Sequence, residues 1–437
     1  MTTAQALSPR AARRAARQES TAAFIATLTP PQGPAWAAPL RKAALERLAD
    51  LTLPDRRDEY WGYTNPDRLI AADIRPAEVF KITDEPPMYQ GIDRLKLVFV
   101  DGVFSAADSD ALEGDGIEIS RLADSGDIHW AKDLYGTLEA KGQKPVARPL
   151  GALNSALATD GVLIRVTGKV SRPVSLIYRR GSEDAAVVLH HVIRMEPGSE
   201  LTLLENGPVA ARANMCLEAD VADGAALHHV RTMGRDHERK GVTHVFARLG
   251  AKSLFKSFSL SMNGRLMRNE AQVWLEGEGG VAHVAGAALG DGTFHHDDTV
   301  FITHSAPGCE SRQVFKKVLR DGAVGVFQGK ILVEQPAQLT DGYQLSQSLL
   351  LDEKCQFLAK PELEIYADDV KCSHGSTSGE ISPDHLFYLR ARGVPEEEAK
   401  LLLVLAFLAE TLDEIDSEDI ANDMRLRLRR WLERHAH

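Results

Sequence analysis

The residues best suited to chemistry lie at Ala367–Gly375, where the sequence reads ADDVKCSHG. Cys372 and His374 are two positions apart, and side chains on a β-strand alternate between its two faces. We therefore expect the thiol and the imidazole to point to the same side and to offer two ligands to zinc or iron. The alternative is structural: a buried thiol beside a hydrogen-bonded imidazole at a strand end.

Further ligands for such a site are not encoded nearby. Zinc and iron–sulfur sites usually need more than two protein ligands, and the chain contains no CxxC or HExxH pattern. A metal at Cys372 and His374 must therefore take ligands from elsewhere, for example from a partner chain. His304, Cys309 and Glu310 form a second thiol–imidazole neighbourhood, but the Pro–Gly turn between them leaves its geometry open.

Composition excludes several classes of protein. The 437 residues are 44% hydrophobic and 26% charged, as in soluble globular proteins, and the net charge of -11 argues against binding to nucleic acids. Four scattered cysteines argue against a disulfide framework, so we expect a reducing compartment and a cytoplasmic protein. The longest apolar run, Leu401–Ala409, is far shorter than the roughly 20 residues that span a bilayer, so no membrane segment is expected.

The N-terminal part of the chain has helical patterns from Ala4 to about Ala72. Its arginine-rich start, Met1–Ser20, has the composition of an organelle transit peptide, but we interpret it as a plain N-terminal helix. The segment Pro54–Thr64 mixes charged and aromatic residues without periodicity, which predicts a docking loop. Helical spacing returns at Leu134–Leu157.

Three helices are predicted at the C-terminus. Ser382 begins the first, Gly393 ends it, Pro395 begins the second and Ser417 begins the third. The second is apolar on every side at Leu401–Ala409, so we expect it to be surrounded by protein. The third has an apolar stripe that we expect to pack within the chain, with some apolar surface left for a partner: Ile420, Met424, Leu428 and Trp431.

The central region, Gly161–Cys372, predicts a β-solenoid. Short alternating strands follow one another with glycine-containing turns, and Gly198, Gly224 and Gly250 are each 26 residues apart. A fixed period of this kind is typical of the coils of a β-helix, whereas the blades of a propeller repeat every 40 to 45 residues or so. A sandwich of this size would be unusually large.

The expected fold class is mainly β, with a parallel β-helix core flanked by N-terminal and C-terminal α-helical domains. Four regions are predicted: an N-terminal helical region at 1–94, a mixed α/β cap at 95–160, the β-helix core at 161–376 and a C-terminal helical domain at 377–437. The cap should contain a strand pair at Leu95–Phe104.

Paired histidines recur through the β region, at His190–His191, His228–His229 and His295–His296. Because neighbours on a strand face opposite ways, each pair can give one member to a site, and we expect most of these imidazoles on the solenoid surface. Gly325–Ile331 is one residue too short for a phosphate loop and has Ile where Ser or Thr should bind magnesium, so no ATPase is expected.

Four segments resemble the SufB/SufD family of iron–sulfur cluster assembly proteins: CESRQ at 309–313, VFQGKI at 326–331, KPELEIYADDVKCSHG at 360–375 and LFYLRARG at 386–393. The ADDVKCSHG form points to the SufD branch. The similarity runs from about Pro54 to about Ala409 and is strongest over Cys309–Gly393. The chain departs from the family at Tyr343, within a TDAxQ-like motif, and at Ala359, where Thr is common, and neither position is a proposed ligand.

The resemblance implies a right-handed parallel β-helix that pairs with a SufB-like chain through the β-helix and docks a SufC-like ATPase through the C-terminal helices. The chain would be a non-catalytic scaffold subunit, with ATP hydrolysis in the partner. Cys372 and His374 carry over as ligands of an iron–sulfur cluster or iron, held transiently at the interface with the SufB-like chain. The resemblance leaves room for a flavin, and a homodimer is expected when the chain is alone.

The competing hypothesis is a β-helix polysaccharide lyase or hydrolase. Asp297, Asp298, Asp368 or Asp369 would then serve as paired carboxylates for acid–base chemistry or calcium binding. The cysteine-containing cytoplasmic profile, the lack of a secretory signal and an aromatic content of 6%, which is low for sugar stacking, weigh against this hypothesis.

Overall fold

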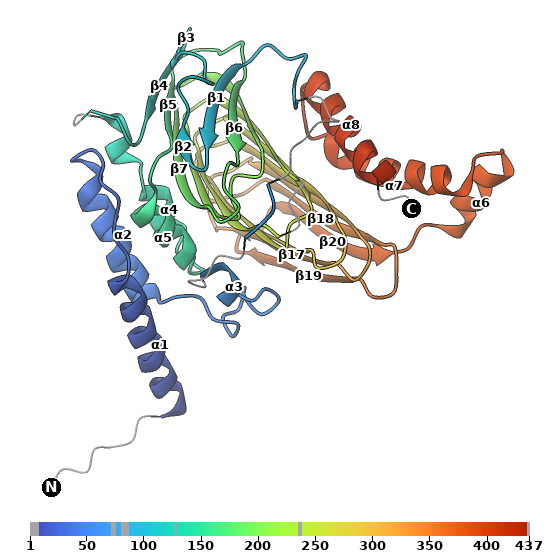
Figure 1. Ribbon diagram of the computed structural model, residues 1–437, viewed down its shortest axis with the longest axis horizontal. Helices are drawn as coiled ribbons and strands as arrows, with labels where there is room; N and C mark the ends of the chain where they lie inside the picture. The colour runs from blue at the N-terminus through green and yellow to red at the C-terminus, as the bar shows by residue number, and fades with distance from the viewer. Residues whose placement is uncertain (1–7, 71–75, 80–86, 127–128, 235–237, 435–437) are drawn as a thin grey trace.

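The chain folds around two large β-sheets that pack face to face. The computed structural model describes residues 8–70, 76–79, 87–126, 129–234 and 238–434. Within these ranges each sheet has ten strands, and from β5 (Val162–Val166) onward successive strands alternate between the sheets (Figure 1). Each pair of strands thus adds one coil to a solenoid. The predicted mainly β fold, a parallel β-helix with helical regions on either side, is confirmed.

The two sheets are named A and B, and their strands are given in spatial order. Sheet A contains β2 (Val103–Phe104), β1 (Leu95–Val100), β6 (Val174–Arg179), β8 (Glu200–Asn206), β10 (Ala226–Met233), β12 (Leu254–Met262), β14 (Val281–Gly290), β16 (Glu310–Leu319), β18 (Thr340–Leu350) and β20 (Val370–Gly379). Sheet B contains β19 (Gln356–Ile365), β17 (Val324–Val333), β15 (His295–His304), β13 (Leu266–Leu275), β11 (Lys240–Leu249), β9 (Arg212–Val221), β7 (Ala186–Met195), β5, β4 (Ile117–Arg121) and β3 (Glu113–Gly114). Pairing is parallel except between β1 and β2, β3 and β4, and β4 and β5.

The coils differ in length along the chain. Glu200 pairs with Ala226, a step of 26 residues, whereas Val324 pairs with Gln356, a step of 32 residues. The strands of the later coils keep a nearly constant length because each must match its neighbours, so the added residues lie in the turns. The 26-residue step between the glycines therefore holds for some coils and not for others.

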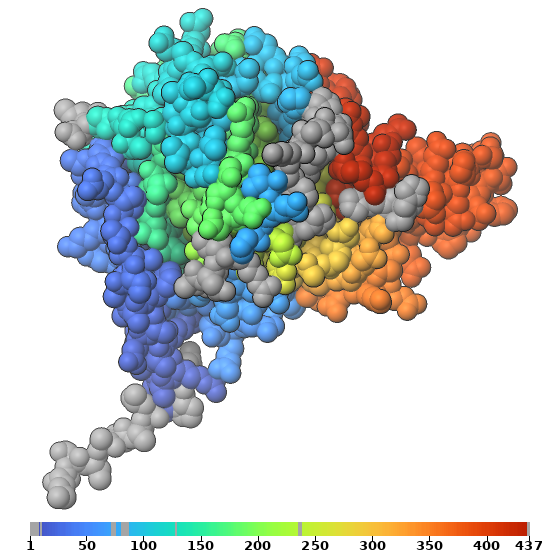
Figure 2. All heavy atoms as spheres, viewed as in Figure 1, coloured from blue at the N-terminus to red at the C-terminus, as the bar shows by residue number. Residues whose placement is uncertain are grey.

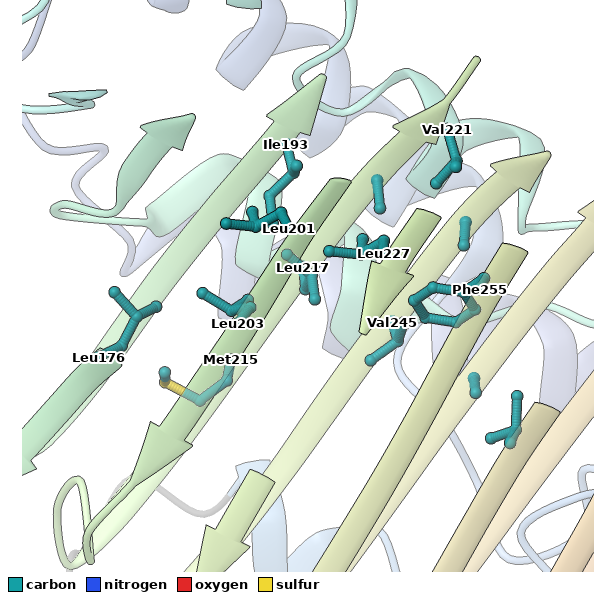
Figure 3. Packing of buried hydrophobic residues seen from close by; sticks show 14 of the residues in the cluster. Leu176, Ile193, Leu201, Leu203, Met215, Leu217, Val221, Leu227, Val245 and Phe255 are labelled. Carbon is teal, nitrogen blue, oxygen red and sulfur yellow. The ribbon is translucent and has the colours of Figure 1, made fainter. Parts of the chain in front are cut away.

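Apolar side chains from both sheets fill the interior of the early coils. Leu201 and Leu203 of β8 point between the sheets and meet Leu217 of β9, as Figure 3 shows. All three side chains are fully buried. Alternation along each strand sends every second residue to this interior and the others to an outer face. The outer faces are also buried, because helices cover them.

The N-terminal helices cover the outer face of sheet B. They are α1 (Pro9–Ala26), α2 (Ala37–Leu51), α3 (Asp67–Ile70), the 3-10 helix η1 (Trp130–Asp133), α4 (Thr137–Lys141) and α5 (Pro149–Leu157). Trp36, at the start of α2, shares a buried cluster with Phe246 and Trp274 of sheet B. Residues 9–26 of the predicted N-terminal helix are confirmed, whereas Met1–Leu7 lie outside the described residues. The helix predicted at Leu134–Leu157 is two helices, since Gly142 ends α4 and Pro149 begins α5.

The C-terminal helices lie on the outer side of sheet A, opposite the N-terminal helices (Figure 1), and the last two of them cover its outer face. They are α6 (Pro383–Ala391), α7 (Glu396–Leu412) and α8 (Glu418–Arg434), as predicted. Ser382 Oγ accepts a hydrogen bond from the His385 amide at 3.4 Å and caps α6. The predicted apolar stripe of α8 is buried against sheet A. The expectation that α7 is surrounded was wrong, because the helix packs on one side only and Leu402 is 42% exposed.

The region before the solenoid merges with its sheets. The predicted strand pair at Leu95–Phe104 is confirmed as the antiparallel hairpin of β1 and β2. β1 also pairs in parallel with β6, so part of the predicted cap extends sheet A. The four domain boundaries stay a prediction. Across the described ranges, no helix is long and apolar enough to cross a membrane.

Candidate functional site

The solenoid ends in two strands that no further coil covers in the described part of the chain. β19 and β20 are the last strands of sheets B and A, and each has a neighbour on one side only. Most of their residues are half-buried or exposed, whereas the preceding strands β17 and β18 have buried inner faces. An edge of this kind presents unpaired backbone N–H and C=O groups to another chain. We call the surface formed by β19 and β20 the open end.

Cys372 and His374 lie together on the inner face of β20 at the open end. Cys372 is the register partner of Gly342 on β18, and His374 is the register partner of Gln344. Two positions along a strand correspond to roughly 6.6 Å, so the thiol and the imidazole stand side by side. Cys372 is half-buried and His374 is exposed. The geometry expected from the alternation of side chains is therefore present.

Glycine makes room for the thiol. A Cβ atom added at Gly342 would lie 3.2 Å from Cys372 Sγ, so the sulfur rests directly over the bare backbone of β18. Burial raises the pKa of the Cys372 thiol, the Gly342 backbone lowers it, and the Asp341 carboxylate raises it further, with a net increase. The thiol is therefore neutral near pH 7, and a bound metal ion must displace its proton.

A loop from the N-terminal region supports the outer face of the open end. Tyr60 is buried, and its hydroxyl donates a hydrogen bond to Glu362 on β19. The Lys360 ammonium lies 4.0 Å from the centre of the Tyr60 ring and 2.9 Å from Glu59 Oε1. The predicted docking loop at Pro54–Thr64 thus contacts the last strand of sheet B in this same chain.

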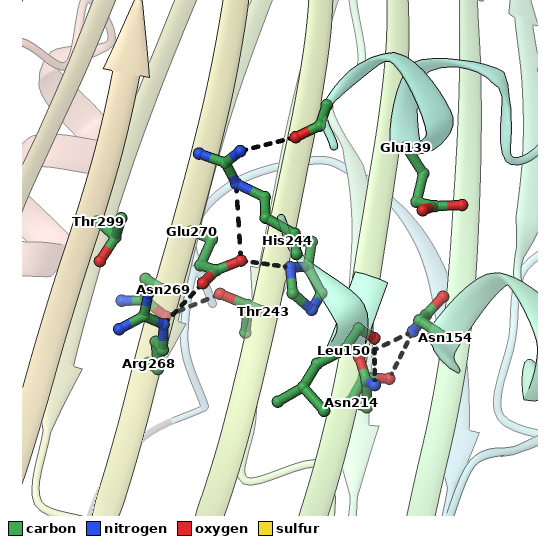
Figure 4. A network of polar contacts seen from close by, with 12 residues as sticks. Glu139, Leu150, Asn154, Asn214, Thr243, His244, Arg268, Asn269, Glu270 and Thr299 are labelled. Atoms are coloured by element: carbon green, nitrogen blue, oxygen red, sulfur yellow. Dashed lines mark hydrogen bonds and ion pairs between the residues drawn. The ribbon is translucent and has the colours of Figure 1, made fainter. Parts of the chain in front are cut away.

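A buried ion network holds this loop in place (Figure 4). Arg268 donates a hydrogen bond to the Tyr60 carbonyl oxygen at 2.8 Å and forms ion pairs with Asp297 and Glu270. Glu270 lies between Arg268 and His244. Burial disfavours the charge of Arg268, but Asp297 and Glu270 outweigh burial and raise its pKa. Arg268 therefore stays charged and ties the loop to sheet B.

The second thiol–imidazole neighbourhood does not form a ligand set. His304 Nε2 lies 2.8 Å from Ser311 Oγ, whereas the Cys309 thiol donates to the Gly277 carbonyl oxygen at 3.3 Å. Glu310 is on the outer face and pairs with Arg312. Among the residues that the structure describes, no group of three or more His, Cys, Asp and Glu side chains could hold a metal ion.

Most histidines of the β region are buried, so the expectation of surface imidazoles was wrong. The physical reason is that carboxylates accompany them: His190 pairs with Glu218 at 2.8 Å, and His229 pairs with Glu205 at 2.8 Å. A histidine that accepts and donates hydrogen bonds can be buried as a neutral ring. Within the three predicted pairs, His228 and His295 are half-buried, and the side chain of His228 is 18% exposed.

One of these histidines belongs to a saturated polar cluster inside the solenoid, centred on Glu205. Glu205 accepts hydrogen bonds from Tyr178 at 2.7 Å and from Arg231 at 2.9 Å, and pairs with His229 at 2.8 Å. His191 Nδ1 accepts from a backbone amide, so its Nε2 carries the proton and donates to the Tyr178 oxygen at 3.0 Å. Burial acts to raise the pKa of Glu205, but Arg231 and His229 hold it well below its ordinary value.

The carboxylates of the competing lyase hypothesis do not form a catalytic pair. Asp297 and Asp298 are neighbours on β15, so they face opposite sides, and both are buried. Asp297 bonds to Arg268 outside the solenoid, whereas Asp298 bonds to Lys317 inside it. Asp368 and Asp369 are exposed in the turn before β20.

Helix α6 presents a second exposed surface. It contains no buried residue, and Phe387 and Tyr388 are 74% and 56% exposed. The space-filling view shows this part of the chain protruding from the body of the molecule (Figure 2). Large aromatic side chains at such exposure are typical of protein-binding surfaces.

The chain thus belongs to the class of parallel β-solenoids with helices on both outer faces, and it has a thiol–imidazole pair at its open end. Residues 178–407 match the family model described as the SufBD core domain of SUF system FeS cluster assembly. The chain belongs to this SufBD family, whose members take part in iron–sulfur cluster assembly.

Curated relatives extend the similarity over most of the chain. The iron–sulfur cluster assembly protein SufD of Escherichia coli is 29% identical over 411 residues, which cover 89% of this chain and 92% of that protein. SufD of Bacillus subtilis is 28% identical, covering 90% of this chain and 93% of that protein. An iron–sulfur cluster assembly SufBD family protein of Synechocystis is 26% identical, covering 88% and 89%.

Proposed function

We propose that this protein is a non-catalytic scaffold subunit of a complex that assembles iron–sulfur clusters. The observation that carries the proposal is the placement of Cys372 and His374 side by side on the inner face of an uncovered strand. Thiolate and imidazole are suitable ligands for iron–sulfur species. The cluster is cargo in this scheme, and ATP hydrolysis belongs to a partner.

The open end is consistent with a partner chain that supplies the remaining ligands. Iron sites need about four ligands, and this pair offers two, so the proposal takes the others from a SufB-like chain that pairs with the edges of β19 and β20. Ile365 and Tyr366, at the end of β19, are 40% and 64% exposed and supply apolar contact area. When the SufB-like chain is absent, the same edges would join two copies of this chain.

The decisive experiment is co-expression with the SufB-like and SufC-like proteins of the same source, followed by anaerobic purification. His374→Ala should leave the complex assembled but lose most of its iron and acid-labile sulfide. Ser373→Ala is the matched control, because Ser373 is the neighbouring residue on the other face of β20, and its complex should keep wild-type iron and sulfide. Wild-type iron content in the His374→Ala complex would contradict the proposal.

The exposed face of α6 supports binding of the SufC-like ATPase to the C-terminal helices. Phe387→Ala combined with Tyr388→Ala should abolish co-purification with the ATPase while leaving association with the SufB-like chain intact. Aromatic residues at the centre of an interface often cost 2 kcal/mol or more when truncated, which is roughly a 30-fold loss of affinity. Retention of the ATPase by the double variant would show that it binds elsewhere.

A further inference from the structure

A column of polar side chains leads through the solenoid interior to the open end. Gln313 on β16, Gln344 on β18 and His374 on β20 are successive register partners in sheet A, and all three lie on its inner face. Neighbouring strands are about 4.8 Å apart, so each side chain stands next to the following one. Gln313 and Gln344 are fully buried, whereas His374 is exposed. The column thus connects the buried interior with the proposed iron ligand.

The Gln344 carboxamide is held in place without a hydrogen bond. Both Oε1 and Nε2 are buried and lack a hydrogen-bond partner among the described residues. Burying an amide in this way costs the desolvation of each unsatisfied group, and native structures usually avoid it. Gly329 on the opposite sheet leaves room for the group, since a Cβ atom there would lie 1.6 Å from Gln344 Nε2. The interior therefore leaves room for the Gln344 amide but gives it no hydrogen-bond partner among the described residues.

Gln313 offers the complementary atom. Its Nε2 donates a hydrogen bond to the Lys330 carbonyl oxygen at 3.3 Å, which fixes the orientation of the amide. Its Oε1 is buried and has no partner within the described part of the chain. An amide NH₂ donates and an amide oxygen accepts, so Gln344 Nε2 and Gln313 Oε1 match. Lys330 follows Gly329 in sequence, so both amides lie against the same backbone segment.

His374 requires a hydrogen-bond acceptor when it binds a metal. A metal-bound imidazole nearly always donates its second ring N–H to a carboxylate, a carbonyl or water, and that bond fixes its tautomer and orientation. Gln344 Oε1 is a buried acceptor directly beside His374 in the register. The next inward-facing residue on β18, Ser346, already bonds to Ser376 at 2.9 Å.

We infer that Gln344 is the positioning residue of His374. In the iron-loaded state Gln344 Oε1 accepts the second N–H of the His374 ring, while Gln344 Nε2 donates to Gln313 Oε1. Gln344 and the oxygen of Gln313 thus lack hydrogen-bond partners until the imidazole turns toward the metal. This inference rests on the proposed function, since it takes His374 as an iron ligand.

The test is a Co²⁺ titration of the anaerobic complex with the SufB-like chain, with Co²⁺ as a spectroscopic probe for Fe²⁺. Gln344→Met keeps the length of the side chain and removes its hydrogen-bonding groups. It should raise the Co²⁺ Kd by about 10- to 100-fold and shift the ligand-field absorption bands. Gln344→Glu keeps an acceptor at the same place and should restore most of the affinity. Ser348→Ala is the control, because Ser348 is a buried, inward-facing residue of β18 away from the column.

Three outcomes would overturn the inference. If Gln344→Met has the wild-type Kd and spectrum while His374→Ala loses Co²⁺ binding, the positioning role fails and the proposed function stands. If His374→Ala itself binds Co²⁺ as wild type does, the proposed function fails as well. Thermal melting establishes that each complex is folded. If the Gln344→Met complex does not assemble, Gln313→Met is used instead. A rise in the Co²⁺ Kd smaller than the one expected for Gln344→Met supports the inference, and an unchanged Kd overturns it.

Discussion

Two buried polar groups inside the same solenoid differ in whether they have hydrogen-bond partners. Glu205, in an early coil, is surrounded by Tyr178, His229 and Arg231, and each of its carboxylate oxygens has a partner. Gln344, one coil from the open end, has a carboxamide without a hydrogen bond in the described structure. A saturated group stabilises the fold, whereas an unsatisfied group next to an open surface is available for another task. Three predictions test this difference.

The largest effect is expected in the saturated cluster. Glu205→Ala leaves the buried Arg231 guanidinium without its carboxylate, so the free energy of unfolding should fall by about 3 to 5 kcal/mol. Denaturant unfolding followed by circular dichroism measures the change. Glu200→Ala is a suitable comparison, because Glu200 pairs with Lys169 at the surface and should contribute about 1 kcal/mol or less. If the two variants lose the same free energy of unfolding, the buried Glu205 contributes no more to stability than the exposed Glu200 does.

The second effect is a loss of stability in mild acid. Burial lowers the pKa of His191 and of His304 to about 4, below the unfolded value of about 6.5. The unfolded state therefore binds more protons between pH 6.5 and 4, and stability is lost as the pH falls through this window. Each histidine should contribute a slope of at most about 1.4 kcal/mol per pH unit.

Glu205 contributes to this slope only at the acidic end of the window. Its pKa is held well below its ordinary value, so its contribution to stability begins to fall near about pH 5 and continues to fall at lower pH. His304→Gln should therefore reduce the slope of stability against pH between 6.5 and 4, measured by urea unfolding at several pH values. If the variant has the same slope, the pKa of His304 is the same in the folded and unfolded states.

The smallest effect on stability is expected at Gln344. Replacing an unsatisfied buried amide by an apolar group of similar shape is close to neutral or stabilising, so Gln344→Met should change the free energy of unfolding by less than about 1 kcal/mol. The same variant should lose Co²⁺ affinity, as described above. Urea unfolding of the isolated chain provides the measurement. A destabilisation comparable to that of Glu205→Ala would mean that the amide is structural.

The sequence was sufficient for the solenoid and for the placement of Cys372 and His374 on one face of a strand. Alternation along a strand placed Cys372 and His374 on one face, and the glycine spacing indicated a solenoid, because both patterns are local. The buried imidazoles were missed because their carboxylate partners, such as Glu218 for His190, lie a coil away in sequence. Gln344 was missed for the same reason: only the register between β18 and β20 brings it beside His374. Long-range register depends on turn lengths, and these vary from coil to coil.

The position of Cys372 and His374 on the last strand also has a consequence for local opening of the chain. In a linear stack each coil is stabilised by the coils before and after it, whereas the final coil has one such contact. Transient opening therefore costs the least free energy in β20, and amide hydrogen exchange should be fastest there among the strands of the later coils. The proposed ligands Cys372 and His374 therefore lie on the strand that opens most easily, while the coils behind them keep their structure.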